Sequence, residues 1–481
     1  MLYHLFMQFE DAFSGVRLIS YITFRATFAA IFAFVVATWV GPGIVASLRK
    51  RKIAGYTKTG SDEVDSQRDL KKDVPTMGGV ILLIGVALSG FLFVRLDNPY
   101  TWVVLLGFLA FGALGAVDDW HKLTDRQSRG ISERQKLGGQ LLISLLAIGT
   151  LYGLGNAQDG LDPWRMPSMK ENPYALKWVK RHTVVEGESW NSLAEKYLGN
   201  PDRAAEIAIR NGIEREKAKL AAVLSAPAGG DICDPDVPEA VYYAPTVDRE
   251  IDLPAAWPDR RDHHRHDLQI PINKKFCLDL GLLFIPLGIL VIVGASNAVN
   301  LTDGMDGLAI GTTATVAIAF AFIAYVVGRV DFSQELYLFY VPEGGEIAII
   351  GAALVGGSLG FLWFNSYPAQ VFMGDTGSLS IGGILGLMAV ALRHELTLLI
   401  AGGIFVSEAL SVIWQRAYFK STRRRAQKAG DPNATGKRWF RCAPFHHHYQ
   451  MGGMHESKVV IRFWIVSVIC VLTALALLKV R

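Results

Sequence analysis

Long apolar blocks alternate with short polar stretches along most of the 481-residue chain. A helix needs about 20 mostly apolar residues to cross the hydrocarbon core of a bilayer. We interpret ten blocks as spans, at 23–48, 77–94, 102–117, 138–154, 278–295, 308–327, 347–364, 379–392, 396–418 and 459–478. The blocks at 102–117 and 379–392 are short, so we expect flanking residues to extend them; a re-entrant segment is the alternative. The pattern predicts an all-α polytopic membrane protein.

The loops between these blocks differ in charge. Those after odd-numbered spans are basic, with RKRK at 49–52 and seven Lys and Arg between 423 and 441. The loop at 328–346 instead holds Arg329 against four acids. Cytoplasmic loops carry the excess of Lys and Arg, so we expect the odd-numbered loops to be cytoplasmic and both termini to lie outside.

Composition narrows the class of protein. Apolar residues make up 51% and charged residues 19% of the chain, below the roughly 25% charged of soluble domains. The net charge of +4 gives little support to a nucleic-acid partner, and four scattered cysteines do not form a disulfide framework. Glu10 and Asp11 interrupt the first twenty residues, so no cleavable signal peptide is expected.

Five polar sequences fall on the predicted cytoplasmic face. They are KKDVPTMGG (71–79), AVDDWHK (116–122), NAVNLTDGMDG (297–307), NSYPAQVFMGDTGS (365–378) and APFHHHY (443–449). Random polar residues would be found on both faces, so we expect one site at the inner membrane surface. The basic residues of the same loops, including Lys122 and Lys136, are mostly explained by the charge rule.

The acids of these sequences point to a divalent cation. Asp118, Asp119, Asp303, Asp306 and Asp375 would repel one another if brought together. Mg²⁺ relieves such repulsion and favours one or two carboxylates together with phosphate oxygens. A lone Asp here would more often cap a helix, but the set favours phosphoryl transfer.

The histidines and one buried acid need separate interpretation. Three consecutive residues, His446, His447 and His448, cannot all point one way, so a three-histidine metal site is not expected. Glu408 lies within an apolar block, where an unpaired charge is costly. We expect it to face the site or a polar partner.

At these residues the sequence resembles the phospho-N-acetylmuramoyl-pentapeptide-transferase branch of the polyprenyl-phosphate N-acetylhexosamine-1-phosphate transferases. The shared signatures read PTMGG, DDWHK, SNAVNLTDGMDGLA, FMGDTGS and APFHHHYQ here. The resemblance covers almost all of residues 15–160 and 268–481. The resemblance implies transfer of phospho-MurNAc-pentapeptide from UDP-MurNAc-pentapeptide to undecaprenyl phosphate, giving lipid I and UMP, in a bacterial inner-membrane enzyme that is expected to be a homodimer.

The resemblance also implies roles. Asp375 would hold Mg²⁺, Asp118 and Asp119 would serve the lipid phosphate, with Asp118 a candidate general base, and His447 would be needed for activity. The implied substrate-binding residues are Lys71, Thr76, Lys122, Asn300, Asp303, Asp306, Asn365, Phe372, Gln415, His446 and His448. Two departures stand out: Gln450 replaces a family Glu, and the loop 421–436 is longer than usual.

The connection between the fourth and fifth spans is far longer than an ordinary loop. We divide the chain into a transferase core at 1–160 and 268–481 and an extracytoplasmic insertion at 161–267. Within it, about 182–227 resembles a LysM module: a strand, a helix capped by Ser189, a second helix ending at Asn211, and a closing strand. That family binds peptidoglycan glycans. A spacer is the plainer interpretation, with Trp190 in its core, and His263, His264 and His266 belong to a solvated linker.

Three alternatives stay open. A UDP-GlcNAc-type hexosamine-phosphate transferase would share most of the site. A non-catalytic anchor displaying the LysM module would not need intact Asp118, Asp375 and His447. A transporter would place acids in mid-span, whereas here only Glu408 lies there.

Overall fold

The computed structural model describes residues 1–7, 18–51, 74–124, 130–157, 178–183, 188–198, 250–254, 267–271, 277–329, 332–333, 336, 338–339, 341, 344–429, 431 and 435–479. The chain divides into two compact units. The larger comprises Met1–Trp164, His264–Arg329 and Leu336–Arg481, and the smaller comprises Arg165–His263 and Val330–Glu335.

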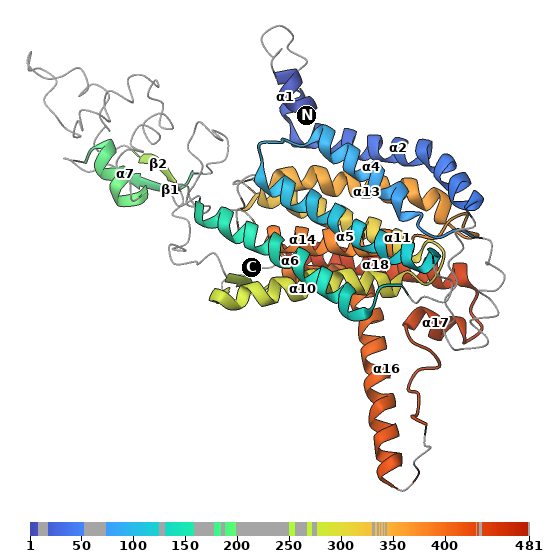
Figure 1. Cartoon of the computed structure of the whole chain (residues 1–481). Coiled ribbons are helices and arrows are strands. Elements are labelled where there is room, and N and C mark those ends of the chain that lie inside the picture. The colour runs from blue at the N-terminus through green and yellow to red at the C-terminus, as the bar shows by residue number, and fades with distance from the viewer. Residues whose placement is uncertain are drawn as a thin grey trace, which may run out of the picture. The chain divides into compact units, whose positions relative to one another are not determined.

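The larger unit is a bundle of helices (Figure 1), and a helix is found at each of the ten predicted spans. These are α2 (Ile22–Lys50), α4 (Gly79–Phe93), α5 (Pro99–Thr124), α6 (Glu133–Ala157), α10 (Phe284–Thr302), α11 (Leu308–Val327), α13 (Gly345–Asn365), α14 (Gly374–Ala391), the pair α15 (Glu395–Ala401) and α16 (Gly403–Lys428), and α18 (Glu456–Leu477). Seven candidate membrane spans, or up to eight with the bent pair, are long and apolar enough to cross a membrane among the described residues. The chain is therefore a polytopic helical membrane protein.

Flanking residues extend both short blocks, as expected: α5 runs over 26 residues and α14 over 18. The start predicted at 278 is wrong. Residues Cys277–Asp279 form strand β4, which pairs antiparallel with β3 (Asp267–Gln269), and the 3-10 turn η4 (Gly281–Leu283) leads into α10. Shorter helices are α1 (Leu2–Met7) and α17 (Phe445–Gln450).

The ninth predicted span is not one straight helix. α15 and α16 meet at Gly402 with a bend of 84°. α16 then continues to Lys428, so much of the stretch expected to be a long loop at 421–436 is helical. In Figure 1 α16 leaves the bundle across the direction of α5 and α18. Its buried residues, Ile404, Phe405, Glu408 and Ser411, all lie near its start.

α14 is the central helix of the bundle, since 89% of its span is buried. It packs against α5 and α10, while α13 packs against α2 and α11. Glycines allow the closest crossings: a Cβ on Gly79 would collide with the backbone of Gly377, and one on Gly115 would collide with the carbonyl of Asp375. Small residues at helix crossings let backbones approach in this way. They bring the ends of α4, α5 and α14 together.

The smaller unit contains strand β1 (Trp178–Thr183), helix α7 (Trp190–Leu198) and strand β2 (Glu250–Pro254). The cap expected at Ser189 is confirmed, because its hydroxyl accepts a hydrogen bond from the Ser192 N–H at 3.1 Å. Trp190 is buried, as expected of a core residue. β1 pairs with β2, which lies beyond 182–227. The predicted second helix, the closing strand and the three linker histidines are outside the described residues, so the LysM-like module stays a prediction.

A buried ion pair joins α2 and α13. The Arg25 guanidinium donates two hydrogen bonds to Glu346, at 2.7 and 2.6 Å, and both side chains are almost fully buried. Glu346 also accepts the Arg95 backbone N–H at 2.8 Å, and Arg25 donates to the Phe93 carbonyl at 3.2 Å. The pair therefore links α2 and α13 to the turn after α4.

Replacing Arg25 by Met should destabilise the bundle by about 3–5 kcal/mol, because it leaves the Glu346 carboxylate buried without its counter-ion. Thermal unfolding of the detergent-solubilised chain measures the loss. The double variant Arg25→Met/Glu346→Leu removes both charges and should recover much of the stability. Equal loss in both variants would contradict the electrostatic explanation.

Candidate active site

Asp119, near the end of α5, caps the first turn of α14. Its two carboxylate oxygens accept the N–H groups of Asp375 at 3.2 Å and Thr376 at 2.9 Å, and the Thr376 hydroxyl at 2.7 Å. The first N–H groups of a helix have no partner within the helix and carry partial positive charge. A buried carboxylate from a neighbouring helix satisfies them. Asp119 therefore fixes the position of Asp375.

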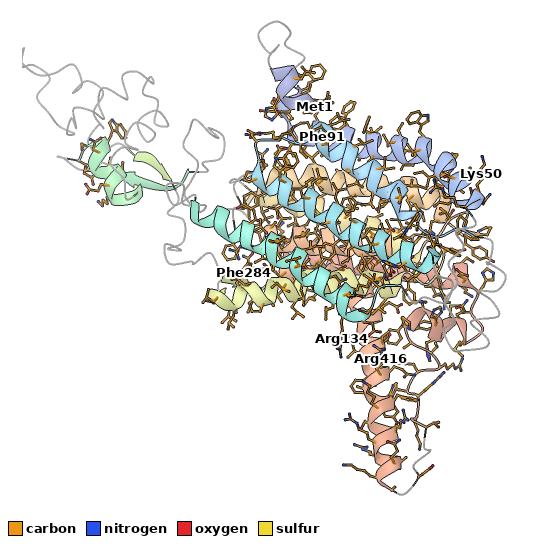
Figure 2. All side chains as sticks on the ribbon, viewed as in Figure 1. Met1, Lys50, Phe91, Arg134, Phe284 and Arg416 are labelled. Carbon is orange, nitrogen blue, oxygen red and sulfur yellow. The ribbon has the colours of Figure 1, made fainter. Side chains whose placement is uncertain are left out.

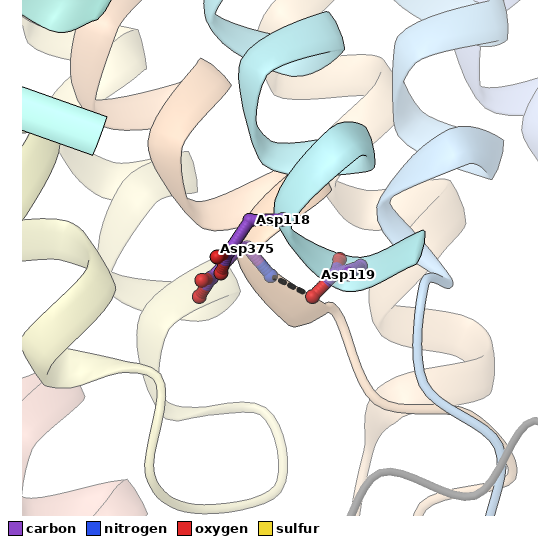
Figure 3. A group of neighbouring side chains, drawn as sticks. All are labelled: Asp118, Asp119 and Asp375. Carbon is purple, nitrogen blue, oxygen red and sulfur yellow. Dashed lines mark hydrogen bonds between the residues drawn. The ribbon is translucent and has the colours of Figure 1, made fainter. Parts of the chain in front are cut away.

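Asp118 and Asp375 lie side by side (Figure 3). They share the ammonium of Lys122. Lys122 Nζ is 2.6 Å from Asp118 Oδ2 and 2.8 Å from Asp375 Oδ2. Lys136, in the first turns of α6, places its Nζ 2.6 Å from Asp375 Oδ2. Asp118 also accepts the Ile131 N–H at 2.9 Å, where Gly130 has a φ of +84°. Two carboxylates and two ammonium groups thus form a compact, partly exposed cluster.

Asn300, at the end of α10, contacts the same cluster. Its amide donates to Asp375 Oδ1 at 2.6 Å and to the Ser378 hydroxyl at 2.8 Å. Among the described residues, oxygens of Asp118, Asp119 and Asp375 lie within 4.8 Å of one another, a spacing suited to a metal ion. Both oxygens of Asp119 are used by the first turn of α14, whereas Oδ2 of Asp118 and Oδ2 of Asp375 contact lysine side chains, which can turn to phosphate. Asp118 and Asp375 are therefore better suited to hold Mg²⁺ with phosphate oxygens.

Two of the sequence motifs pair through their backbones beside this cluster. The Phe372 N–H donates to the Pro75 carbonyl at 2.8 Å, and the Gly78 N–H donates to the Phe372 carbonyl at 2.8 Å. Gly374 has a φ of +72°, and a Cβ there would collide with Asp119 and with the Thr76 hydroxyl. Thr76 and Phe372 therefore lie next to the carboxylates. Lys71 is outside the described residues.

Hydrogen bonds tie the loop after α10 to the end of α13 and to the segment that follows it. Asp306 accepts the Ala369 N–H at 3.0 Å, and Asn365 accepts the Gly307 N–H at 3.0 Å. Both side chains are buried, whereas Asp303 at the end of α10 is partly exposed. Asp306 and Asn365 thus shape the loop that carries Asp303.

The three histidines point to three different partners, as expected. His446 is fully buried; its Nδ1 is 3.3 Å from Glu408 Oε1, and its ring fills the space over Gly304, where a side chain would have no room. His447 Nδ1 lies 3.1 Å from Gln450 Oε1. His448 Nδ1 accepts the Arg441 N–H at 3.2 Å. Glu408 has the polar partner expected for it.

Comparison with known proteins identifies the family. The glycosyl transferase family 4 model matches residues 262–393. The chain is 35% identical to the phospho-N-acetylmuramoyl-pentapeptide-transferase of Maridesulfovibrio salexigens and 33% identical to that of Thermodesulfovibrio yellowstonii, over 481 residues and the full length of both chains in each pair. The chain belongs to the phospho-N-acetylmuramoyl-pentapeptide-transferase family. It is therefore a transferase of the membrane.

Gln415 of the transferase, predicted to bind substrate, is used within the protein. Its side-chain oxygen accepts the N–H groups of Trp439 and Phe440, each at 3.0 Å, and its amide donates to the Phe440 carbonyl at 3.2 Å. These bonds hold the chain that returns from α16 to the histidines. Gln415 therefore fixes the position of that segment.

Sequence reasoning missed two residues of the cluster. Lys136 was attributed mainly to the charge rule, yet its ammonium contacts Asp375. Thr376 was not singled out, although it lies within FMGDTGS and contacts Asp119. The motif itself was the available signal for Thr376, whereas no local pattern distinguishes Lys136 from other cytoplasmic lysines.

Replacing Gly304 by Ala should lower transferase activity roughly tenfold to a hundredfold, since the added methyl displaces the His446 ring and misplaces the histidine turn. Steady-state turnover measures the effect. Gly294→Ala is the matched control, because its Cβ would meet nothing within 4 Å. Wild-type turnover in Gly304→Ala would show that His446 does not need its present position.

Proposed function

We propose that the chain transfers phospho-MurNAc-pentapeptide from UDP-MurNAc-pentapeptide to undecaprenyl phosphate, giving lipid I and UMP. The observation that carries the proposal is the convergence of Asp118, Asp375, Lys122 and Lys136 at one end of a membrane bundle. The full-length relatives bear the name of this activity. The proposed reaction does not depend on the LysM-like module.

The reaction exchanges one bond to phosphorus. A phosphate oxygen of the lipid attacks the β-phosphorus of the nucleotide, and the bond to the oxygen bridging the two phosphates breaks. The bonding electron pair leaves with UMP. A phosphate monoester loses its second proton with a pKa of about 6, so the attacking oxygen needs little help from a base. This argues for charge neutralisation rather than proton removal as the main task of Asp118.

The charged cluster suits a reaction dominated by positioning and electrostatics. Lys122 and Lys136 can hold phosphate oxygens, since their ammonium groups are partly exposed beside Asp375. Asp375 and Asp118 would hold Mg²⁺, which when bound neutralises charge on the diphosphate. Asp119 acts as a positioning residue, because its oxygens cap α14.

The remaining predicted residues divide by exposure. Thr76, Asp303, Phe372 and His448 are partly exposed and could contact nucleotide or sugar. Asp306, Asn365 and His446 are buried and would act through the loops that they hold. His447, with Gln450 on its Nδ1, would turn its other ring nitrogen to the diphosphate.

The proposed topology follows from charge. We propose ten crossings or partial crossings of the bacterial inner membrane, with the site at the cytoplasmic surface, the insertion outside and a homodimer as the assembly. The basic ends of α2 and α16, including Arg49 and Lys50, support this sidedness.

Purified protein in detergent should release UMP when given UDP-MurNAc-pentapeptide, Mg²⁺ and undecaprenyl phosphate. Asp375→Asn should reduce the rate about 100-fold or more, because it removes a charge placed for the transferring group. Coupled UMP detection measures both. Thr315→Ser, remote from the cluster, serves as the control variant. Activity with UDP-GlcNAc instead would assign the chain to the other branch of the superfamily. No UMP release with either sugar nucleotide would favour the non-catalytic anchor.

For the insertion we propose binding of peptidoglycan glycan, as the LysM resemblance implies. The small buried core of Trp190, Leu193 and Ala194 in α7 supports a folded module.

Deleting 166–265 and reclosing the loop should leave UMP release in detergent within about twofold of the full chain, because DDW and FMGD lie in the other unit. It should abolish co-sedimentation with purified peptidoglycan. The full chain is the reference in both assays. Unchanged sedimentation, or lost catalysis in a protein with wild-type thermal unfolding, would contradict the accessory role.

A further inference from the structure

The outer half of α16 has a charge pattern that the transfer reaction does not explain. Between residues 409 and 455 the chain has nine Lys and Arg and one acid, Asp431. Six of the cations are on α16, and all six are exposed: Arg416, Lys420, Arg423, Arg424, Arg425 and Lys428. In Figure 2 the side chains beyond the labelled Arg416 extend away from the bundle. Among the described residues, none of them contacts Asp118, Asp119 or Asp375.

The exposed residues of α16 are of the types found at a membrane surface. Exposed Leu410 and Ile413 come first, nearest the bundle. An aromatic group follows: the rings of Trp414 and Tyr418 are 6.1 and 5.2 Å from the ring of Trp439, edge to face, and both tryptophans are more than half exposed. Beyond Tyr418 every charged residue of α16 is a cation. Aromatic rings and cations are both favoured at the lipid headgroups of an inner membrane surface.

The direction of α16 keeps its cations near the headgroups. After the bend of 84° the helix runs across the bundle, as Figure 1 shows, so its outer end advances along the membrane surface. Its 26 residues span about 39 Å. A helix continuing along the bundle axis would instead carry Arg423, Arg424 and Arg425 away from the lipid.

The chain returning from α16, residues 435–441, is bound tightly along one side of it. The Lys437 N–H donates to the Thr422 hydroxyl at 2.9 Å. Thr422 lies two helical turns beyond Gln415, whose side chain accepts the Trp439 N–H. Gly436 lies against the Phe419 carbonyl with no room for a Cβ. This return segment adds Lys437, Arg438 and Arg441 to the exposed cations.

We propose that the outer half of α16 and the return segment dock onto the anionic lipid headgroups of the membrane. The inner surface of a bacterial membrane attracts cations, and each one near such a surface raises partitioning roughly fivefold. The return segment ends at the histidines, where Phe440 packs 5.7 Å from the His448 ring and the Arg441 N–H donates to it. Docking would therefore also steady the turn that carries His447. This goes beyond the transfer reaction and does not require it.

Selectivity for spin-labelled lipids tests the proposal on the full chain in nanodiscs, without substrate. Wild-type protein should immobilise spin-labelled phosphatidylglycerol at least about threefold more strongly than the phosphatidylcholine analogue. The triple variant R423Q/R424Q/R425Q should lose most of this preference. The triple variant R423K/R424K/R425K keeps the charges and should retain it, and 1 M salt should weaken it in both retaining proteins.

Wild-type lipid selectivity in the glutamine variant, with an unchanged melting temperature, would overturn the proposal. A rise in the KM for the sugar nucleotide beside that result would assign these arginines to the nucleotide. Faster hydrogen exchange in 435–441 of the glutamine variant, in phosphatidylglycerol nanodiscs only, would support the link to the histidine turn.

Discussion

The crossing of α5 and α14 depends on one electrostatic arrangement, in which adjacent aspartates do different work. Asp119 neutralises the amino end of α14, while Asp118 turns to the other side and shares lysines with Asp375. Consecutive residues on a helix point about 100° apart, so one pair can serve both tasks. A buried carboxylate would be costly without such donors. The cluster is stable because every acid in it has N–H or ammonium partners, and Asp118 and Asp375 share theirs.

Close packing of the helix backbones brings the partners of that arrangement together. The ends of α4, α5 and α14 approach through Gly79, Gly115 and Gly377, where no Cβ fits. The carboxylates of α5 and α14, which are far apart in the sequence, then lie close enough to share one hydrogen-bond donor. Gly304 likewise has no room for a Cβ, because the His446 ring lies against it. This contact ties the histidine turn to the loop after α10. The site is therefore rigid where it holds charge.

α16 differs from the rest of the bundle, because among the described residues its fully buried positions all lie at its base. Glu408 and Ser411 are buried at the base, and beyond them the helix is solvent- or lipid-exposed. If α16 docks as proposed, its connection to His448 through residues 435–441 joins the membrane surface to the candidate site. A transferase whose second substrate is a lipid phosphate gains from such a connection, because the site and the lipid phosphate must lie at the same depth in the membrane.

The sequence by itself determined the helices, the membrane class and the motifs that meet at the site, because apolar block length and residue type are local properties. It also indicated that three histidines would diverge and that Glu408 would find a partner. Only the tertiary structure decided which acid caps a helix and which faces the lysines, that Lys136 joins Asp375, that Gln415 clamps the return segment, and that the ninth block bends at Gly402. These outcomes depend on distances between residues remote in the chain. No local pattern of hydrophobic and polar positions carries that information.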